Sequence, residues 1–518
     1  MRITGLGHAG LYVETNAGTV LCDPWRSPAY FASWFPFPDN SGVDWDACQR
    51  PDYLYVSHLH RDHFDPEALG RVAKSATVLL PDYPTDELRT ALAELGFRRF
   101  VTTRSDEPVE LDGLRVMIQA LAGPTDGPIG DSLLALDDGR HRLLNQNDAH
   151  PHDLDPVSGF GPFDAHLLQF SGAIWYPVAY RLPGRAMAEL GRRKRRAGLD
   201  RAHRYAAAVG ARYVFPVAGP PCFLDDDLFH LNDLYGDDCN VFPDQRVFLA
   251  ELTGRGTDAG RLLLPGTLAD LAEPGCPVRH QIPEEEIERI FNDKAGYLHD
   301  YAARARPRIE AEHAQWPRPG LDVLAELKAR FEPLLADAPH LRAGVGAPVL
   351  LEVGDQPLVI DFPARQVRPW AGERCRYQFQ VARPLVEHLI ATGETDWVNS
   401  LFLSCRFSAR RIGRYNEHLY TFFKCLSPTR LEYVERWYAE QNDPGPEVPL
   451  GDWLVQRHCP HLRSDLTRFG EIDDAGVLTC HTHGWRFDLA TGRCLTAEGH
   501  SINARRREPA DAVVASRS

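Results

Sequence analysis

Two cysteine–histidine pairs near the C-terminal end constrain the fold of this chain more than any other feature. Residues 459–461 read Cys-Pro-His, and residues 480–483 read Cys-His-Thr-His. Each pair sits on its own loop, so the fold must bring two thiols and two imidazoles to one point. Such a set can hold a [2Fe–2S] cluster, with two cysteines on one iron and two histidines on the other. The spacing predicts an iron–sulfur site whose ligands are Cys459, His461, Cys480 and His483.

A zinc ion is the alternative occupant of these four residues. Zinc fingers and knuckles place two cysteines close together before their histidines, whereas here one histidine follows each cysteine. Gly484 permits a close backbone approach, and residues 485–493 are expected to form strand, turn and strand. The pattern resembles the Rieske domain of ring-hydroxylating oxygenases and their ferredoxins over residues 441–500. The resemblance implies an all-β domain with a [2Fe–2S] Rieske cluster that carries electrons singly.

A second group of metal-binding side chains follows an early strand-like run. Residues 57–63 read Ser-His-Leu-His-Arg-Asp-His. In an extended segment His58 and His60 point to the same side. The turn that follows can bring Asp62 and His63 into the same cavity. Three imidazoles and a carboxylate suit one or two borderline metals, and the other interpretation is a hydrogen-bonded polar turn.

This histidine loop resembles the His-x-His-x-Asp-His motif of the metallo-β-lactamase fold, and the resemblance spans residues 1–240. Gly7-His8-Ala9 and Asp23-Pro24 sit where the first strands of that superfamily carry Gly-His-Ser and Asp-Pro. Asn147-Asp148 ends a predicted strand and matches its bridging aspartate. The resemblance implies an αββα sandwich with a catalytic metal centre held by His58, His60, Asp62, His63 and Asp148. His8 and Asp23 are expected to support these ligands or form turns rather than bind the metal.

The chain departs from that superfamily at two positions. A third-motif histidine is missing near residues 122–130, and Ala218-Gly219 stands where a late histidine should follow the strand. A zinc hydrolase without both imidazoles would lose the pocket that activates its water. A ligand set richer in carboxylate suits non-haem iron that binds O₂. The residues that could fill the gaps are Asp126, Asp131, His150 and His152, although residues of these types in such positions are more often surface loop residues.

Length and composition indicate the number of domains and the kinds of partner that the chain can have. A chain of 518 residues exceeds one hydrophobic core. We expect an α/β (α+β) protein with a metallo-β-lactamase-like domain at 1–265, a helical and mixed α/β connecting domain at 266–440, the Rieske domain at 441–500 and a disordered tail at 501–518. A net charge of −15 argues against a nucleic-acid partner. No apolar run suggests a membrane span, and a labile cluster favours the cytoplasm.

The combination of the two domains carries a functional expectation. A Rieske domain joined to a metallo-β-lactamase-like domain resembles the CMP-N-acetylneuraminate hydroxylases. The domain order resembles more closely the actinobacterial UDP-N-acetylmuramate hydroxylases, which make N-glycolylmuramate for peptidoglycan. The resemblance implies an O₂-dependent monooxygenase acting on the N-acetyl methyl of a nucleotide sugar. It also implies non-haem iron, one or two ions, in place of zinc. NAD(P)H would supply electrons through a reductase or ferredoxin, and electron transfer between subunits would imply a homo-oligomer.

Two other functions remain open from the residues alone. The first is a metallo-β-lactamase-fold hydrolase whose Rieske domain senses redox state. The second is an electron carrier with a vestigial N-terminal domain. A hydroxylase of another N-acetylated nucleotide sugar, such as CMP-N-acetylneuraminate, is the alternative within the hydroxylase function.

Overall fold

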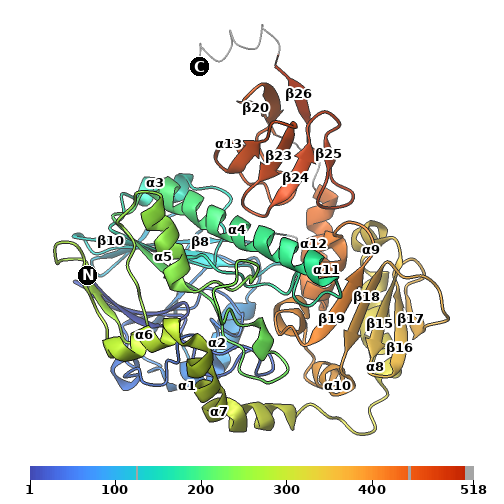
Figure 1. Ribbon diagram of the computed structural model, residues 1–518, viewed down its shortest axis with the longest axis horizontal. Helices are drawn as coiled ribbons and strands as arrows, with labels where there is room; N and C mark the ends of the chain where they lie inside the picture. Colours follow the sequence, from blue (N-terminus) through green and yellow to red (C-terminus); the bar gives the residue numbers. More distant parts are fainter. Residues whose placement is uncertain (124–126, 441–444, 508–518) are drawn as a thin grey trace.

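The computed structural model describes residues 1–123, 127–440 and 445–507. Figure 1 shows three regions: a large layered region from the first half of the chain, a smaller mixed region beside it, and a small β domain placed over helix α4 (Gly184–Val209). Within the described ranges, no helix is both long enough and apolar enough to cross a membrane.

Two β-sheets form the centre of the N-terminal region. The first sheet has the order β14-β13-β1-β2-β3-β4-β5-β6, and the second has the order β12-β11-β10-β9-β8-β7. The first consists of β1 (Arg2–Gly7), β2 (Gly10–Thr15), β3 (Gly18–Cys22), β4 (Tyr53–Tyr55), β5 (Thr77–Leu80), β6 (Arg99–Thr102), β13 (Leu268–Asp270) and β14 (Val278–Arg279). The second consists of β7 (Val109–Leu111), β8 (Leu114–Ala120), β9 (Ser132–Asp137), β10 (Arg142–Asn147), β11 (Ala165–Gln169) and β12 (Tyr213–Val217).

The apolar faces of these strands decide the layers. One cluster joins Ile3 and Val20 of the first sheet to Leu134 and Phe215 of the second, so the two sheets pack face to face. The outer face of the first sheet packs on α1 (Pro66–Arg71) and α2 (Glu87–Glu94). The outer face of the second packs on α3 (Asp155–Phe160), α4 (Gly184–Val209) and α5 (Gln245–Gly254). This is the αββα sandwich of the metallo-β-lactamase-like fold, which confirms the expected fold class.

The first sheet runs past the boundary expected at residue 265. β13 pairs antiparallel with β1, and β14 pairs with β13. Helix α6 (Glu284–Asn292) and helix α7 (Lys294–His313) then pack on the same domain, because Ile290 and Tyr297 share a core with Phe35 and Phe37. Pairing between positions so far apart in the chain leaves no local pattern, which is why the sequence placed the boundary too early.

The middle region has its own five-stranded sheet, in the order β17-β16-β15-β18-β19. Its strands are β15 (Pro348–Val353), β16 (Gln356–Asp361), β17 (Gln366–Pro369), β18 (Tyr377–Val381) and β19 (Phe407–Arg411). Its helices are α8 (Val323–Ala336), α9 (Pro339–Val345), α10 (Arg383–Ala391), α11 (Glu417–Lys424) and α12 (Pro428–Glu440), together with a single π-helical turn at Val398–Phe402. One apolar core joins the sheet to these helices. The expected mixed α/β composition is therefore present.

The C-terminal domain consists of two small antiparallel sheets. Their orders are β20-β21-β26 and β22-β23-β24-β25. The strands are β20 (Glu447–Leu450), β21 (Trp453–Gln456), β22 (Gly470–Ile472), β23 (Val477–Cys480), β24 (Trp485–Asp488), β25 (Arg493–Cys494) and β26 (Ala504–Arg506), with one turn of helix α13 at Leu466–Phe469. The domain is all-β apart from α13, as expected.

The end of the chain differs from the expected disordered tail. β26 pairs with β21, with Val455 opposite Ala504, so the domain extends beyond residue 500. The arginine-rich composition of residues 505–507 resembles a solvated tail, but the backbone hydrogen bonds of β26 go to β21. Residues 508–518 lie outside the described part of the chain.

Candidate metal centres

The loops at one edge of the sandwich position the first metal centre. The histidine loop begins directly after β4, Asp131 directly precedes β9, and Asp148 directly follows β10. His8 occupies the turn between β1 and β2. Because neighbouring strands end at the same edge, residues far apart in the sequence converge there.

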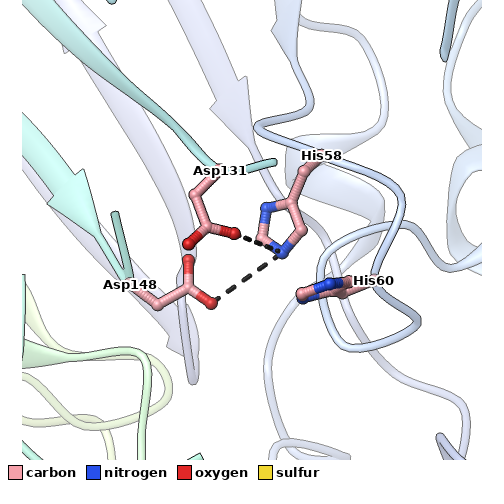
Figure 2. Close-up of side chains that lie close together, drawn as sticks. All are labelled: His58, His60, Asp131 and Asp148. Carbon is pink, nitrogen blue, oxygen red and sulfur yellow. Dashed lines mark ion pairs between the residues drawn. The ribbon is translucent and has the colours of Figure 1, made fainter. Parts of the chain in front are cut away.

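One group of four side chains has ligand atoms within 4.8 Å of one another: His58, His60, Asp131 and Asp148. Figure 2 shows the two imidazoles facing the two carboxylates across a small space. The Nε2 atom of His58 lies 3.5 Å from Oδ1 of Asp131 and 3.8 Å from Oδ2 of Asp148. Asp131, one of the residues considered for the missing third-motif ligand, therefore belongs to this group.

A second group, His8, Asp62 and His63, lies beside the first. The Nε2 atom of His8 is 2.9 Å from Oδ2 of Asp62. The Nε2 atom of His63 is 3.3 Å from Oδ2 of Asp148, so that carboxylate lies between the two groups and can bridge them. The sequence had assigned His8 a supporting role, whereas the structure places it among the ligand candidates.

Positive φ angles of the backbone around the centre explain how His8 reaches this position. Five non-glycine residues around the centre have positive φ angles: His8 at 53°, Asp23 at 40°, Tyr30 at 53°, Asn147 at 42° and Ala218 at 51°. Such angles are uncommon outside glycine and cluster at functional sites. The N–H of Ala218 donates to the carbonyl oxygen of His8 at 3.1 Å. The loop at Ala218, where the late histidine is missing, therefore hydrogen-bonds the turn that carries His8.

Asp23 and Ser57 orient the imidazoles of His58 and His63 through their Nδ1 atoms. The carboxylate of Asp23 accepts from the backbone N–H and the hydroxyl of Ser57, both at 2.7 Å, and lies 2.9 Å from Nδ1 of His63. The Ser57 hydroxyl lies 2.9 Å from Nδ1 of His58. With each Nδ1 engaged in this way, the Nε2 atom is the one that can bind a metal.

Two buried nitrogen atoms of the centre suit metal binding. Among the described residues, the Nε2 atoms of His58 and His63 are buried and form no hydrogen bond, although each lies within 3.5 Å of a carboxylate of the centre. Buried polar atoms of this kind need an explanation, and a bound cation provides one. Burial lowers the pKa of His58 and of His60, so both imidazoles are neutral at pH 7 and can donate a lone pair.

Tyr30 is a residue of this centre that the sequence did not reveal. Its hydroxyl donates to Oδ1 of Asp62 at 2.5 Å. Burial is the largest cause that raises the pKa of Tyr30, followed by the charge of Asp62. The hydroxyl therefore stays protonated and leaves Oδ2 of Asp62 to face His8 and His63. The only signal in the sequence is that Tyr30 stands in an aromatic segment, with Phe31, Trp34, Phe35 and Phe37, that precedes the histidine loop.

The remaining candidates for the missing ligands lie elsewhere. His150 and His152 face the C-terminal domain, where their rings approach His483. Asp126 lies outside the described residues.

The four predicted cluster ligands meet in the C-terminal domain. Cys459 and Cys480 are buried, and the neighbouring Cys459 thiol is the largest cause that lowers the pKa of Cys480, to about 7. The rings of His461 and His483 are 4.8 Å apart, and His461 stacks on Trp485 at 4.0 Å. The Nδ1 atom of His483 is buried without a hydrogen-bond partner in the described chain. Two thiols and two imidazoles in this arrangement fit a Rieske cluster.

Comparison with known proteins decides the family. The Mycobacterium tuberculosis (strain ATCC 25618 / H37Rv) protein Rv3818, named as a Rieske 2Fe-2S iron-sulfur protein, is 50% identical to this chain over 516 residues, covering 98% of this chain and 100% of the relative. This chain belongs to the Rv3818-like Rieske iron–sulfur proteins. The model of the Rieske [2Fe-2S] domain matches residues 451–504, and that of the Rv3818-like, SCP2-like domain matches residues 323–440. The connecting region expected at residues 266–440 thus contains a domain that a family model matches.

Two solved structures are similar to the N-terminal half at low sequence identity. CmlA, a diiron β-hydroxylase from Streptomyces venezuelae, is 20% identical with a TM-score of 0.34, covering 51% of this chain and 53% of that one. Igni18, a metallo hydrolase from Ignicoccus hospitalis KIN4/I, is 16% identical with a TM-score of 0.34, covering 52% of this chain and 96% of that one. Similarity at this level does not transfer the chemistry of either protein.

Proposed function

We propose that this protein is an iron-dependent oxygenase, in which the Rieske cluster supplies electrons to a metal centre that reduces O₂. The observation that carries the proposal is the position of Asp131, which joins His58, His60 and Asp148 around one point. A group with two carboxylates and two imidazoles suits iron that binds O₂. A Rieske cluster in the same chain supplies single electrons, which a hydrolase would not need.

The proposed reaction converts a C–H bond to C–OH. One oxygen atom of O₂ enters the product and the other leaves as water, with the consumption of two electrons and two protons. When bound, the iron supplies the binding and reduction of O₂. The protein residues fix the geometry, because Asp23 and Ser57 orient His63 and His58. Burial of Asp62 and His63 limits the access of bulk water to their side of the centre.

We further propose the N-acetyl methyl group of a nucleotide sugar as the substrate, with UDP-N-acetylmuramate as the specific compound. The domain combination and order support this choice through their resemblance to the N-acetyl hydroxylases. NAD(P)H would deliver electrons through a reductase or ferredoxin in the cytoplasm, where the reducing conditions favour a labile iron–sulfur site. Another N-acetylated nucleotide sugar would use the same metal chemistry.

The test is oxygen incorporation by the full chain with its cluster and iron. The reduced protein is mixed with UDP-N-acetylmuramate and ¹⁸O₂, and the product is examined by mass spectrometry. We expect a glycolyl product that contains one labelled oxygen. If CMP-N-acetylneuraminate alone is hydroxylated, the substrate is wrong and the oxygenase proposal stands; if neither sugar nucleotide gains oxygen, the proposed reaction is wrong.

A hydrolase is the second candidate, because Asp148 lies between two ligand groups, as a dinuclear water-activating centre requires. Metal analysis separates the two. Iron beyond the two atoms of the cluster supports the oxygenase, whereas zinc in the N-terminal domain together with substrate cleavage supports the hydrolase.

A further inference from the structure

The segment 148–152 joins the two metal centres. Asp148 belongs to the ligand group in the sandwich, and two residues later the ring of His150 lies 6.4 Å from the ring of His483. The ring of His152 lies 5.4 Å from the same His483 ring. Two residues of extended chain span at most roughly 7 Å, so the backbone at His150 is within that distance of the backbone at Asp148.

Direct contacts between the domains hold this segment against the cluster loops. The Nδ1 atom of His152 lies 3.3 Å from the hydroxyl of Ser464, on the loop that carries Cys459 and His461. The N–H of Asp465 donates to the carbonyl oxygen of His152 at 3.4 Å. Arg201 of α4 donates to the carbonyl oxygen of Thr482 at 3.4 Å. The two histidines therefore contact both loops that carry cluster ligands.

Apolar and ionic contacts surround this meeting point. The ring of Tyr205 lies 6.3 Å from His150, stacked upon it, and 5.2 Å from Phe469 of the cluster domain. Arg468 of the same domain pairs with Asp155 of α3 at 2.5 Å. Packed rings and an ion pair on one side of the cluster indicate a built interface within one chain rather than a chance approach of two domains.

We propose that residues 148–152 form an electron route inside one chain, with His150 and His152 as positioning residues between the cluster and the catalytic metal. The proposal rests on the oxygenase function proposed above. In each transfer one electron leaves the reduced cluster by way of His483 and reduces a ferric ion bound beside Asp148 to ferrous. The cluster returns to its oxidised state, and an NAD(P)H-linked reductase supplies the next electron. Two such transfers serve one oxygenation.

An internal route makes a prediction that transfer between subunits does not. The reduced cluster should lose its electron at the same rate in the monomer as in any oligomer, because dilution that separates subunits would stop transfer between them. The expectation of electron transfer between subunits rested on resemblance. In the structure, the cluster ligand His483 lies beside His150 and His152 of the same chain.

The experiment follows the visible absorption of the cluster after flash photoreduction of the full, iron-loaded protein without O₂. We expect single-exponential reoxidation of the cluster, with formation of ferrous iron, at a rate independent of dilution. His150→Leu and His152→Leu should slow this step by about tenfold or more, because small displacements of reacting groups have large effects on rate. The EPR signal and midpoint potential of the cluster should stay unchanged, which shows that the domain is folded and its driving force intact.

The matched control is Arg468→Ala, which removes an ion pair across the same interface without touching either histidine. Its transfer rate should equal that of the wild type. The route is wrong if both histidine variants transfer as fast as the wild type, if the control slows as much as they do, or if the rate rises with concentration. These results leave oxygen insertion by the wild type intact, whereas a wild-type cluster that never reduces the iron contradicts the oxygenase function itself.

Discussion

Glu417 of the SCP2-like domain lies against the Rieske ligand His461, with its Oε2 atom 3.5 Å from Nε2 of the imidazole. This carboxylate is buried at the start of α11, and its other oxygen accepts from the hydroxyl of Tyr438 at 3.0 Å and lies 3.4 Å from Nε2 of His500. Burial opposes ionisation, but the hydrogen bond from His500 and the charge of His461 lower the pKa of Glu417 to about 2. The middle domain thus places a negative charge beside the cluster.

Glu417→Gln should raise the midpoint potential of the cluster. A carboxylate stabilises the more positive, oxidised cluster, so its removal favours reduction. We expect a rise of tens of millivolts, since a tenfold change in a one-electron equilibrium corresponds to about 59 mV. An EPR-monitored redox titration measures it. Glu447→Gln, which removes an exposed carboxylate of β20, is the control and should leave the potential unchanged. A midpoint potential in the Glu417 variant that equals or falls below that of the wild type would contradict the expectation.

Asp23→Asn should weaken metal binding in the sandwich although Asp23 belongs to neither ligand group. The carboxylate orients His63 through Nδ1 and also fixes Ser57. Loss of such an orienting partner costs about 10–100-fold in metal affinity. Iron content per chain after dialysis against a chelator gives the measurement, with Asp52→Asn, whose carboxylate accepts from Thr19 far from the centre, as the control. Equal iron retention in both variants would contradict the proposal that Asp23 orients His63 for metal binding.

Ligands that are close in the chain could be predicted, and those that depend on distant contacts could not. The histidine loop and the cysteine–histidine pairs carry their geometry in their spacing. His8 joins Asp62 only because a turn with φ of 53° meets the loop at Ala218 from another sheet. Asp131 was one of four candidates, because a single sequence does not show which loop residue places its side chain beside His58 and Asp148. Glu417 could not be foreseen, since it reaches the cluster from another domain.

The same reasoning explains which parts of the fold were foreseen. The sandwich and the all-β domain follow from runs of strand-like residues around known motifs. The strand β26 was missed because its arginines suggest a solvated tail, although its backbone pairs with β21. Residues 268–279, which form β13 and β14, were placed in the next domain because only the pairing of β13 with β1, and of β14 with β13, joins them to the first sheet.

Arg430→Met should destabilise the contact between the SCP2-like domain and the sandwich. Arg430 is largely buried and pairs with Glu87 at 2.7 Å and with Asp396 at 3.1 Å. Its removal leaves two carboxylates unpaired, which would cost several kcal/mol in a fully buried site; partial exposure of Glu87 reduces the expected loss to about 2 kcal/mol. A lower midpoint of thermal unfolding checks it. Arg436→Met, which removes an exposed pair with Glu432, is the control and should change stability by less than about 0.5 kcal/mol.

His8→Ala should remove metal from the second ligand group and leave the Rieske EPR signal intact. His8 contributes the Nε2 atom that faces Asp62 at 2.9 Å, and its loss leaves that group with two ligands. The double variant His8→Ala with Ala218→His should restore part of the iron, because Ala218 hydrogen-bonds the backbone of His8 and stands where the superfamily carries its late histidine. The backbone at Ala218 already has a φ of 51°, which histidine tolerates better than most residues. Iron analysis of the two variants and of Ala218→His alone gives the comparison. Full iron content in the single His8 variant would show that the turn supports the fold rather than the metal.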